Sequence, residues 1–291
     1  MKLRCAISPD ADDLFMFRAI TEGLIDTEGL TFEVVSVDTD KLNRMAKGDG
    51  PDVTAISIAH YPMVAENYQM LAHGGSVGRG YGPVVVAKPA MLATAGEQKM
   101  SALLEGRRIA VPGLTTTACL VLRMITRFDP IVIPIAPTSL QFDALRADEV
   151  DAALIIHEGR LTYAAEGFVQ LLDIGDWWFV KTALPLPLGG NVIRRDLGAD
   201  VIARADRVMH ASIAHGLAHR AEAIDWLLAR GGTLRTRDAV DLYLSLYANA
   251  DTLDYGSDGR DGIRELLRRG AEGGWLPACA EVDFVGDPRP E

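Results

Sequence analysis

The chain has 291 residues, of which 48% are hydrophobic and 24% are charged, a composition typical of globular proteins and not of disordered ones. Its formal net charge of −11, from 29 basic and 40 acidic residues, argues against nucleic acid or an anionic membrane as the main partner. The length is sufficient for two hydrophobic cores of ordinary domain size.

Cysteine usage and the N-terminus both indicate a reducing compartment. Cys5, Cys119 and Cys279 are far apart and lack metal-ligand spacing, so neither a disulfide framework nor a structural zinc site is expected. The first apolar stretch, Cys5–Ile7, is shorter than the roughly 7–15 apolar residues of a secretory signal. No stretch approaches the roughly 20 apolar residues of a membrane span. We therefore expect a cytoplasmic protein.

Short apolar runs alternate with helical patterns along the first two thirds of the chain. The predicted strands are Leu3–Ile7, Thr31–Val37, Val53–Ile58, Pro83–Ala87, Arg108–Val111, Ile131–Ile135 and Ala152–Ile156. The predicted helices between them are Asp12–Thr21, Thr39–Ala46, Thr115–Phe128 and Leu140–Arg146. This alternation predicts an α/β fold with parallel, covered sheets.

After a last strand-like run at Asn191–Arg194, the pattern from Leu197 to Arg269 is almost wholly helical. A helical tail that returns to the first lobe would explain this order. We predict a two-lobed protein in which residues 1–86 and 190–291 form one lobe and residues 87–189 the other. The chain would cross between the lobes near Pro83–Pro89 and Pro187–Asn191, where proline and glycine are frequent.

Four polar segments directly follow predicted strands: Ser8–Asp13, Ser57–Tyr61, Gly113–Thr117 and His157–Tyr163. Ligands of parallel α/β sheets bind beyond the carboxyl ends of the strands. We therefore expect the four segments to meet at a cleft between the lobes.

The segment Gly113–Thr117 combines a Pro-Gly turn with three threonines at the start of an apolar helix. The N-terminus of a helix favours carboxylate or phosphate, and Thr115, Thr116 and Thr117 add hydroxyl groups. An equally good interpretation is that one threonine caps the helix and the other two only fill space. The segment lacks the lysine of a phosphate-binding loop.

His157 stands at the end of the apolar run Ala152–Ile156, where a histidine acts as a general base or is simply hydrogen-bonded at the edge of the core. Ser57 donates to an anion or serves as a small residue in a tight turn. The carboxylates Asp12 and Asp13 suit the first turn of a helix, so helix capping is favoured over a catalytic acid or a metal cluster.

Several stretches resemble a known family. They are LIIHEGRLTY (Leu154–Tyr163), GGSVGRGYGPVVVA (Gly74–Ala87), the turn Pro112–Ala118, LPLPLGGNVIRRDLG (Leu184–Gly198) and YANADTLDYGSDG (Tyr247–Gly259). The chain resembles the menaquinone-biosynthesis family on the type II periplasmic-binding-protein fold, and within it the 1,4-dihydroxy-6-naphthoate synthases of the futalosine pathway. The resemblance runs from about Ile7 to Leu276.

The resemblance implies a lyase without metal or other cofactor, acting on a small aromatic carboxylate in the cleft between the lobes. It implies that His157 is catalytic and that Ser57, Thr116 and Thr117 bind the substrate. A solute-binding protein without chemistry and a chorismate dehydratase-like enzyme are the alternatives. The oligomeric state stays open.

One segment departs from the family pattern. The family opens with Ser-Pro-Cys-Pro-Asn-Asp-Thr-Phe, whereas this chain has SPDADDLF, with Ser8 kept and the asparagine replaced by Asp12. We expect Ser8 and Asp12 in the binding site. A carboxylate at Asp12 would repel an anionic substrate unless it is protonated or turned away.

Overall fold

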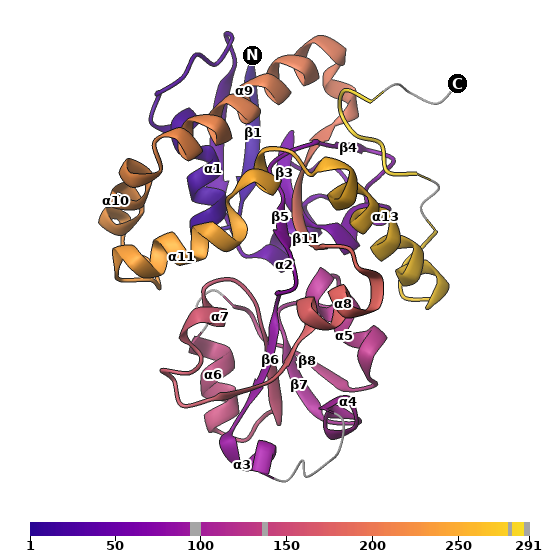
Figure 1. Cartoon of the computed structure of the whole chain (residues 1–291). Coiled ribbons are helices and arrows are strands. Elements are labelled where there is room, and N and C mark those ends of the chain that lie inside the picture. Colours follow the sequence, from indigo (N-terminus) through magenta and orange to yellow (C-terminus); the bar gives the residue numbers. More distant parts are fainter. Residues whose placement is uncertain (94–99, 136–138, 279–280, 288–291) are drawn as a thin grey trace.

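The computed structural model describes residues 1–93, 100–135, 139–278 and 281–287. They form two lobes, each built on its own sheet (Figure 1). The first sheet has the order β2 (Thr31–Ser36), β1 (Lys2–Ile7), β3 (Val53–Ser57), β11 (Leu186–Arg194) and β4 (Tyr68–Met70), with β5 (Ser76–Gly78) also pairing with β11. The second sheet has the order β10 (Val169–Asp173), β6 (Val84–Ala87), β9 (Ala152–Ile155), β7 (Arg108–Val111) and β8 (Asp129–Val132).

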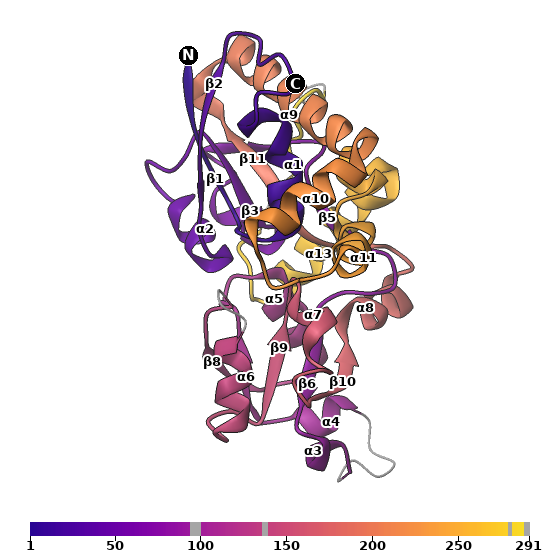
Figure 2. The ribbon, with the colours of Figure 1, turned by 90° about the vertical axis from the view of Figure 1, so that its left-hand side faces the viewer.

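Helices surround both sheets (Figures 1 and 2). Those packed around the first sheet are α1 (Ala11–Thr21), α2 (Thr39–Met45), α9 (Ala199–Ala218), α10 (Arg220–Arg230), α11 (Arg237–Tyr247), α12 (Ala250–Leu253) and α13 (Gly256–Glu272), with 3₁₀ turns η1 (Ile58–Met63) and η2 (Arg195–Leu197). Those of the second lobe are α3 (Pro89–Ala93), α4 (Met100–Leu104), α5 (Thr117–Ile125), α6 (Ser139–Arg146), α7 (Gly159–Thr162) and α8 (Ile174–Thr182). The helical tail returns to the first lobe, as predicted.

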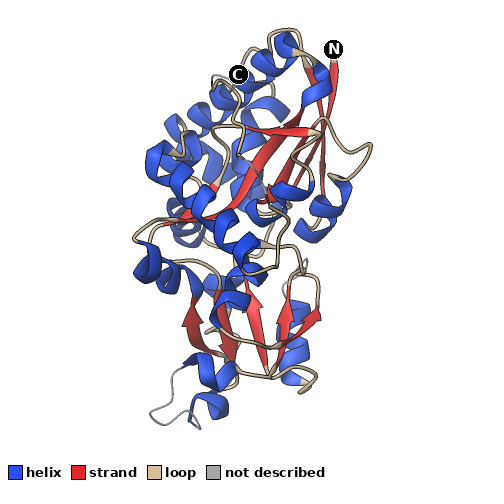
Figure 3. Cartoon of the chain, turned by 90° about the vertical axis from the view of Figure 1, so that its right-hand side faces the viewer, coloured by secondary structure: helices blue, strands red, loops and turns tan. Residues whose placement is uncertain are grey.

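The sheets are mixed, so the prediction of parallel sheets is wrong for two strands. β1 runs parallel to β2 and β3, and β7 runs parallel to β8 and β9. By contrast, β11 is antiparallel to β3, and β6 is antiparallel to β9. Both reversed strands follow a crossing between lobes. They therefore begin at the boundary between the lobes, where their antiparallel neighbours β3 and β9 end. Figure 3 shows the two sheets on either side of this boundary.

The sheets place the crossings close to the predicted ones. β6 already belongs to the second sheet at Val84, and β11 joins the first sheet at Leu186. We keep as a proposal the division into one lobe of residues 1–86 with 190–291 and another of residues 87–189. The bounds of β6 and β11 would move its borders by a few residues. The structure also contains strands β4, β5 and β10 and helix α8, which the sequence patterns do not predict.

The apolar run of β6 shows why the second sheet is covered on both faces. Val84 and Val86 pack with Phe142 of α6 on one face. Val85 and Ala87 face the other side and join the core that contains Trp178 of α8. Alternating side chains of a strand point to opposite faces, so a continuous apolar run predicts a strand buried on both sides.

The sequence predicts neither a disulfide framework nor a membrane span. Cys5 and Cys119 are free and buried, whereas Cys279 lies outside the described residues. Among the helices of the described residues, none combines the length and the hydropathy needed to cross a membrane.

The first crossing packs directly against the start of α8 at two glycines. The N–H of Ile174 donates to the carbonyl of Pro83 over 3.0 Å. A Cβ atom on Gly175 would overlap the carbonyl group of Tyr81, and one on Gly82 would lie 3.0 Å from the Cα of Gly175. Only residues without a side chain allow the backbones to approach this closely.

We predict that Gly175→Ala lowers the free energy of unfolding by about 1–3 kcal/mol, because the backbone of the first crossing must shift to accommodate the methyl group. Urea denaturation followed by circular dichroism measures this. The matched control is Gly232→Ala, whose added Cβ meets nothing within 4 Å. Equal stability of the two variants would contradict the close packing of the first crossing against α8.

Candidate functional site

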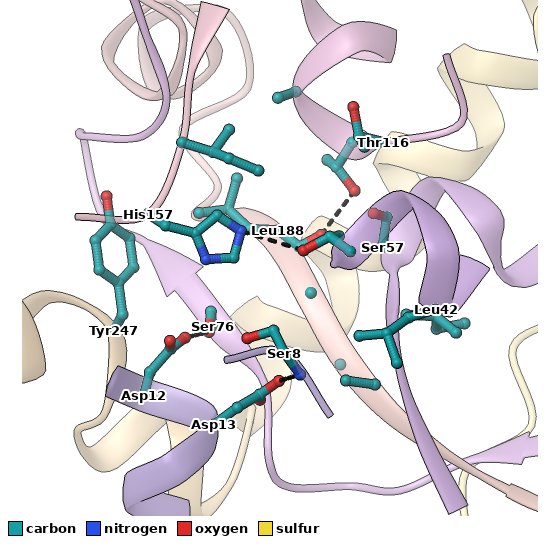
Figure 4. A pocket seen from close by; sticks show the side chains of 18 of the residues that line it. Ser8, Asp12, Asp13, Leu42, Ser57, Ser76, Thr116, His157, Leu188 and Tyr247 are labelled. Atoms are coloured by element: carbon teal, nitrogen blue, oxygen red, sulfur yellow. Dashed lines mark hydrogen bonds between the residues drawn. The ribbon is translucent and has the colours of Figure 1, made fainter. Parts of the chain in front are cut away.

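A cavity of about 750 Å³, part of it open to solvent, lies between the lobes. All four segments predicted from strand ends contribute to its lining. Ser8 and Ser57 come from the first lobe, and Thr116 and His157 come from the second. Figure 4 shows these side chains around one space, with Asp12 and Asp13 on the α1 side. The convergence follows from the strand directions, because β1, β3, β7 and β9 all end at the cleft.

His157 is held between the lobes by both nitrogens of its ring. Its Nδ1 lies 2.5 Å from Oδ2 of Asp10, and its Nε2 lies 3.4 Å from the hydroxyl oxygen of Thr39. The residue has a φ of +54°, in the left-handed region that few side-chain-bearing residues adopt. Backbone of this kind persists where surrounding contacts hold it and is frequent at functional sites.

The pairing with Asp10 dominates the protonation of His157. Burial by itself lowers the pKa of His157, but the charge of Asp10 and the hydrogen bond to it outweigh burial and raise the pKa to about 10. For Asp10, burial acts to raise the pKa, and the same pairing brings it below its ordinary value. His157 is therefore a stronger base than a free histidine, with a neutral form that becomes populated toward alkaline pH.

Glu158 lies beside this pair and points to the start of α1. Its Oε1 accepts the N–H of Ala11 over 3.1 Å, so it serves the N-terminus of that helix. Burial and the nearby charge of Asp10 raise the pKa of Glu158 to about 8. Asp10, His157 and Glu158 each bring one ligand atom to within 4.8 Å of the others. Because contacts within the protein already account for all three, we assign no metal here.

Asp12, the carboxylate that departs from the family pattern, lines the cavity with both oxygens engaged. The hydroxyl of Ser76 donates to its Oδ2 over 2.6 Å, and the hydroxyl of Tyr243 donates to its Oδ1 over 3.0 Å. Burial raises the pKa of Asp12. Two donors and a raised pKa reduce the repulsion that an anionic ligand would meet.

Asp13 and Ser8 build the turn between β1 and α1. The backbone N–H of Ser8 donates to Oδ2 of Asp13 over 2.6 Å, and the N–H of Asp10 donates to the hydroxyl of Ser8 over 3.3 Å. Burial, followed by the charge of Asp12, raises the pKa of Asp13 to about 7. Asp13 therefore holds together the turn before α1, and among the described residues its side chain accepts no N–H group of the helix itself.

The threonines at the start of α5 use their hydroxyls on the protein itself. Thr116 is the N-cap: its hydroxyl donates to the carbonyl of Gly113 and accepts the N–H of Cys119. The hydroxyl of Thr117 donates to the carbonyl of Leu188 over 2.7 Å. Within the described part of the chain, the N–H groups of Thr117 and Ala118 meet no acceptor. Backbone donors, not hydroxyls, are what this helix presents to the cavity.

Ser57 is positioned by Asn43, a residue that the sequence analysis does not single out. Asn43 is fully buried in α2 and joins two strand-end segments. Its Oδ1 accepts the N–H of Ser57 over 2.9 Å, and its Nδ2 donates to the hydroxyls of Ser57 and Thr115. Thr115 thus supports the cleft from outside the lining, whereas the hydroxyl hydrogen of Ser57 stays available to a ligand.

Other lining residues also escape the sequence analysis. Thr39 follows β2, so the strand-end rule itself could have found it. Tyr243 and Tyr247 reach the cavity from α11, where their i, i+4 spacing is the signal that they share one face. Residues of β11 such as Leu188 carry no chemical signal and are found only from the topology.

Comparisons with known proteins agree with this architecture. A family model for menaquinone biosynthesis matches residues 3–272. A 1,4-dihydroxy-6-naphthoate synthase of Thermus thermophilus is 36% identical over 269 residues, which cover 91% of this chain and 92% of the relative.

Two solved structures extend the comparison. A crystal structure of a protein from Archaeoglobus fulgidus is 40% identical with a TM-score of 0.84, covering 94% of this chain and 98% of that one. A Candida albicans protein with the generic periplasmic-binding-protein fold is 14% identical with a TM-score of 0.65 and 99% of both chains covered, which shows the fold alone. The fold is that of the periplasmic binding proteins, and the chain belongs to the menaquinone-biosynthesis family.

Proposed function

We propose that this protein is a lyase that converts cyclic dehypoxanthine futalosine to 1,4-dihydroxy-6-naphthoate in menaquinone biosynthesis. The observation that carries the proposal is His157, a half-buried histidine whose Nε2 faces the cavity while its Nδ1 is occupied by Asp10. The Thermus relative named as such a synthase, similar over nearly the whole chain, supports the same activity. The cytoplasmic location expected from the sequence is part of this proposal.

The proposed chemistry is proton abstraction followed by elimination. Nε2 of His157 takes the proton from a carbon of the bound substrate. The electron pair of the broken C–H bond forms the new double bond, and the leaving group departs with the electron pair of its own bond. The step uses a general base and needs no metal or redox cofactor.

The substrate carboxylate would bind at the opposite side of the cavity from the α1 carboxylates. The unpaired N–H groups of Thr117 and Ala118 at the N-terminus of α5 attract a negative charge. The hydroxyl of Ser57 adds a donor. Because α5 and His157 belong to one lobe and Ser57 to the other, closure of the lobes would bring Ser57 to the bound substrate.

The alternative of a solute-binding protein without chemistry is not favoured. The solved structures of solute-binding proteins share only the fold, for instance 13% identity for an alkanesulfonate-binding protein of Xanthomonas axonopodis. The relative with much higher identity is named as an enzyme. Chorismate consumption by the purified protein would distinguish the chorismate dehydratase-like alternative.

We predict that His157→Ala lowers kcat for cyclic dehypoxanthine futalosine by about 10²–10⁴-fold, the usual range for a general base. Binding of the product should change little, because the proposed anchor is untouched. Product formation is followed by mass and ultraviolet absorbance, and binding by calorimetry. His219→Ala, at the exposed start of α10, is the control. Near-wild-type turnover of His157→Ala would exclude this mechanism.

We predict that Ser57→Ala weakens product binding by about 10-fold, since a hydrogen bond to a charged group is lost. Calorimetry with 1,4-dihydroxy-6-naphthoate measures the effect. Thr54→Val is the matched control, because Thr54 lies on the same strand and its hydroxyl donates to the carbonyl of Ala55. If both variants bind equally well, Ser57 is not part of the anchor.

A further inference from the structure

Asp10 and His157 lie on opposite lobes and meet only at the cleft. Asp10 is the N-cap position of α1, yet its carboxylate makes no capping hydrogen bond and points to the imidazole instead. The side chains of the two residues are 13% and 17% exposed, so the contact is largely shielded from water. A helix N-cap that gives up capping needs another role for its carboxylate.

We propose that Asp10 is the positioning residue of His157: its carboxylate accepts the hydrogen of Nδ1 and leaves Nε2 alone to face the substrate. This inference rests on the proposed function, because it assigns to His157 the part of the base. It adds a residue from the other lobe, so that the pair is complete only when the two lobes meet.

The geometry explains how one contact selects the reactive nitrogen. A neutral imidazole carries its hydrogen on one nitrogen and an electron pair on the other. With Nδ1 2.5 Å from a carboxylate that only accepts, the hydrogen stays on Nδ1. Nε2 then presents its electron pair toward Thr39 and the cavity. The same contact fixes the ring orientation.

Neighbouring groups hold Asp10 in this position. Its own backbone N–H donates to the hydroxyl of Ser8, which Asp13 anchors through the backbone N–H. Glu158 takes the N–H of Ala11 that an ordinary N-cap side chain would leave for other partners. This contact ties the start of α1 to the segment that carries His157 and so helps to hold Asp10 beside the imidazole.

The charges around His157 decide what removal of Asp10 would do. The carboxyl groups that face the imidazole are Asp10 and Asp12 from α1 and Glu158 from its own loop. The phenols of Tyr243 and Tyr247 approach from α11. Burial lowers the pKa of His157, so without Asp10 the pKa falls, and the neutral base is populated at lower pH.

The first test measures His157 itself, without reference to turnover. Nitrogen NMR of histidine-labelled protein follows the six histidines, and His157→Ala identifies the signal. We expect the Nδ1–H tautomer and an alkaline titration in the wild type. In Asp10→Asn the titration should move to lower pH and the tautomer preference should be lost. An unchanged His157 signal in Asp10→Asn would overturn the proposal.

The second test is the pH–rate profile of the whole protein. In the wild type, kcat/KM should rise with pH as His157 loses its proton. Asp10→Asn should shift this rise to lower pH and lower the plateau of kcat by about 10²-fold or more, with KM little changed. Asp10→Glu, which keeps the charge, should regain part of both effects. Loss of activity on adding a chelator would instead mean that Nδ1 binds a metal and would overturn the proposal.

Asp206→Asn is the matched control. Asp206 accepts from His73 over 3.0 Å in a second histidine–aspartate pair that does not line the cavity. Its pH–rate profile should match that of the wild type, and thermal melts should show all variants folded. If wild-type protein forms no dihydroxynaphthoate while the NMR results are as expected, the proposed function fails and the pairing stands. If turnover is normal but Asp10→Asn leaves tautomer and profile unchanged, only the pairing fails.

Discussion

The contact between Asp10 and His157 is the interaction on which the cleft depends. A charged imidazole that is largely shielded from water needs a carboxylate beside it, and the two residues follow strands of different sheets. The position of Asp10 in turn requires the turn that Ser8 and Asp13 hold together. Glu158 adds a second contact to the same region, because its Oε1 accepts the N–H of Ala11 at the start of α1. One pairing thus organises the end of β1, the start of α1 and the end of β9.

The fold brings these groups together through strand direction. Parallel strands of both sheets end at the same interface, so their following loops meet there without long excursions of the chain. The two strands that run the other way, β6 and β11, begin at the interface because the chain has just crossed it. They line the cavity with apolar residues such as Leu188, whereas polar residues follow the other strands. Gly82 and Gly175 let the first crossing and the start of α8 approach closely.

The cleft separates two electrostatic environments. On the α1 side, burial raises the pKa of Asp12 and Asp13, and donors such as Tyr243 occupy the carboxylate oxygens. On the α5 side, backbone N–H groups near Thr117 stand without acceptors among the described residues. An anionic ligand would therefore bind toward α5 with its reacting carbon toward His157. The replacement of an amide by Asp12 is compatible with such a ligand because burial raises the pKa of Asp12 and two hydroxyl donors occupy its oxygens.

Much of this arrangement follows from local sequence. Apolar runs such as Val84–Ala87 determine buried strands, because side chains alternate between two faces that are both covered. Polar residues after the strands locate the cleft, and His157 and Ser57 are found in this way. The direction of β6 and β11, the link through Asn43 and the partner of His157 could not be predicted. They depend on which segments meet in the folded chain. Contacts between residues 72 positions apart, as for Asn43 and Thr115, or 147 positions apart, as for Ala11 and Glu158, leave no periodic signal in the sequence.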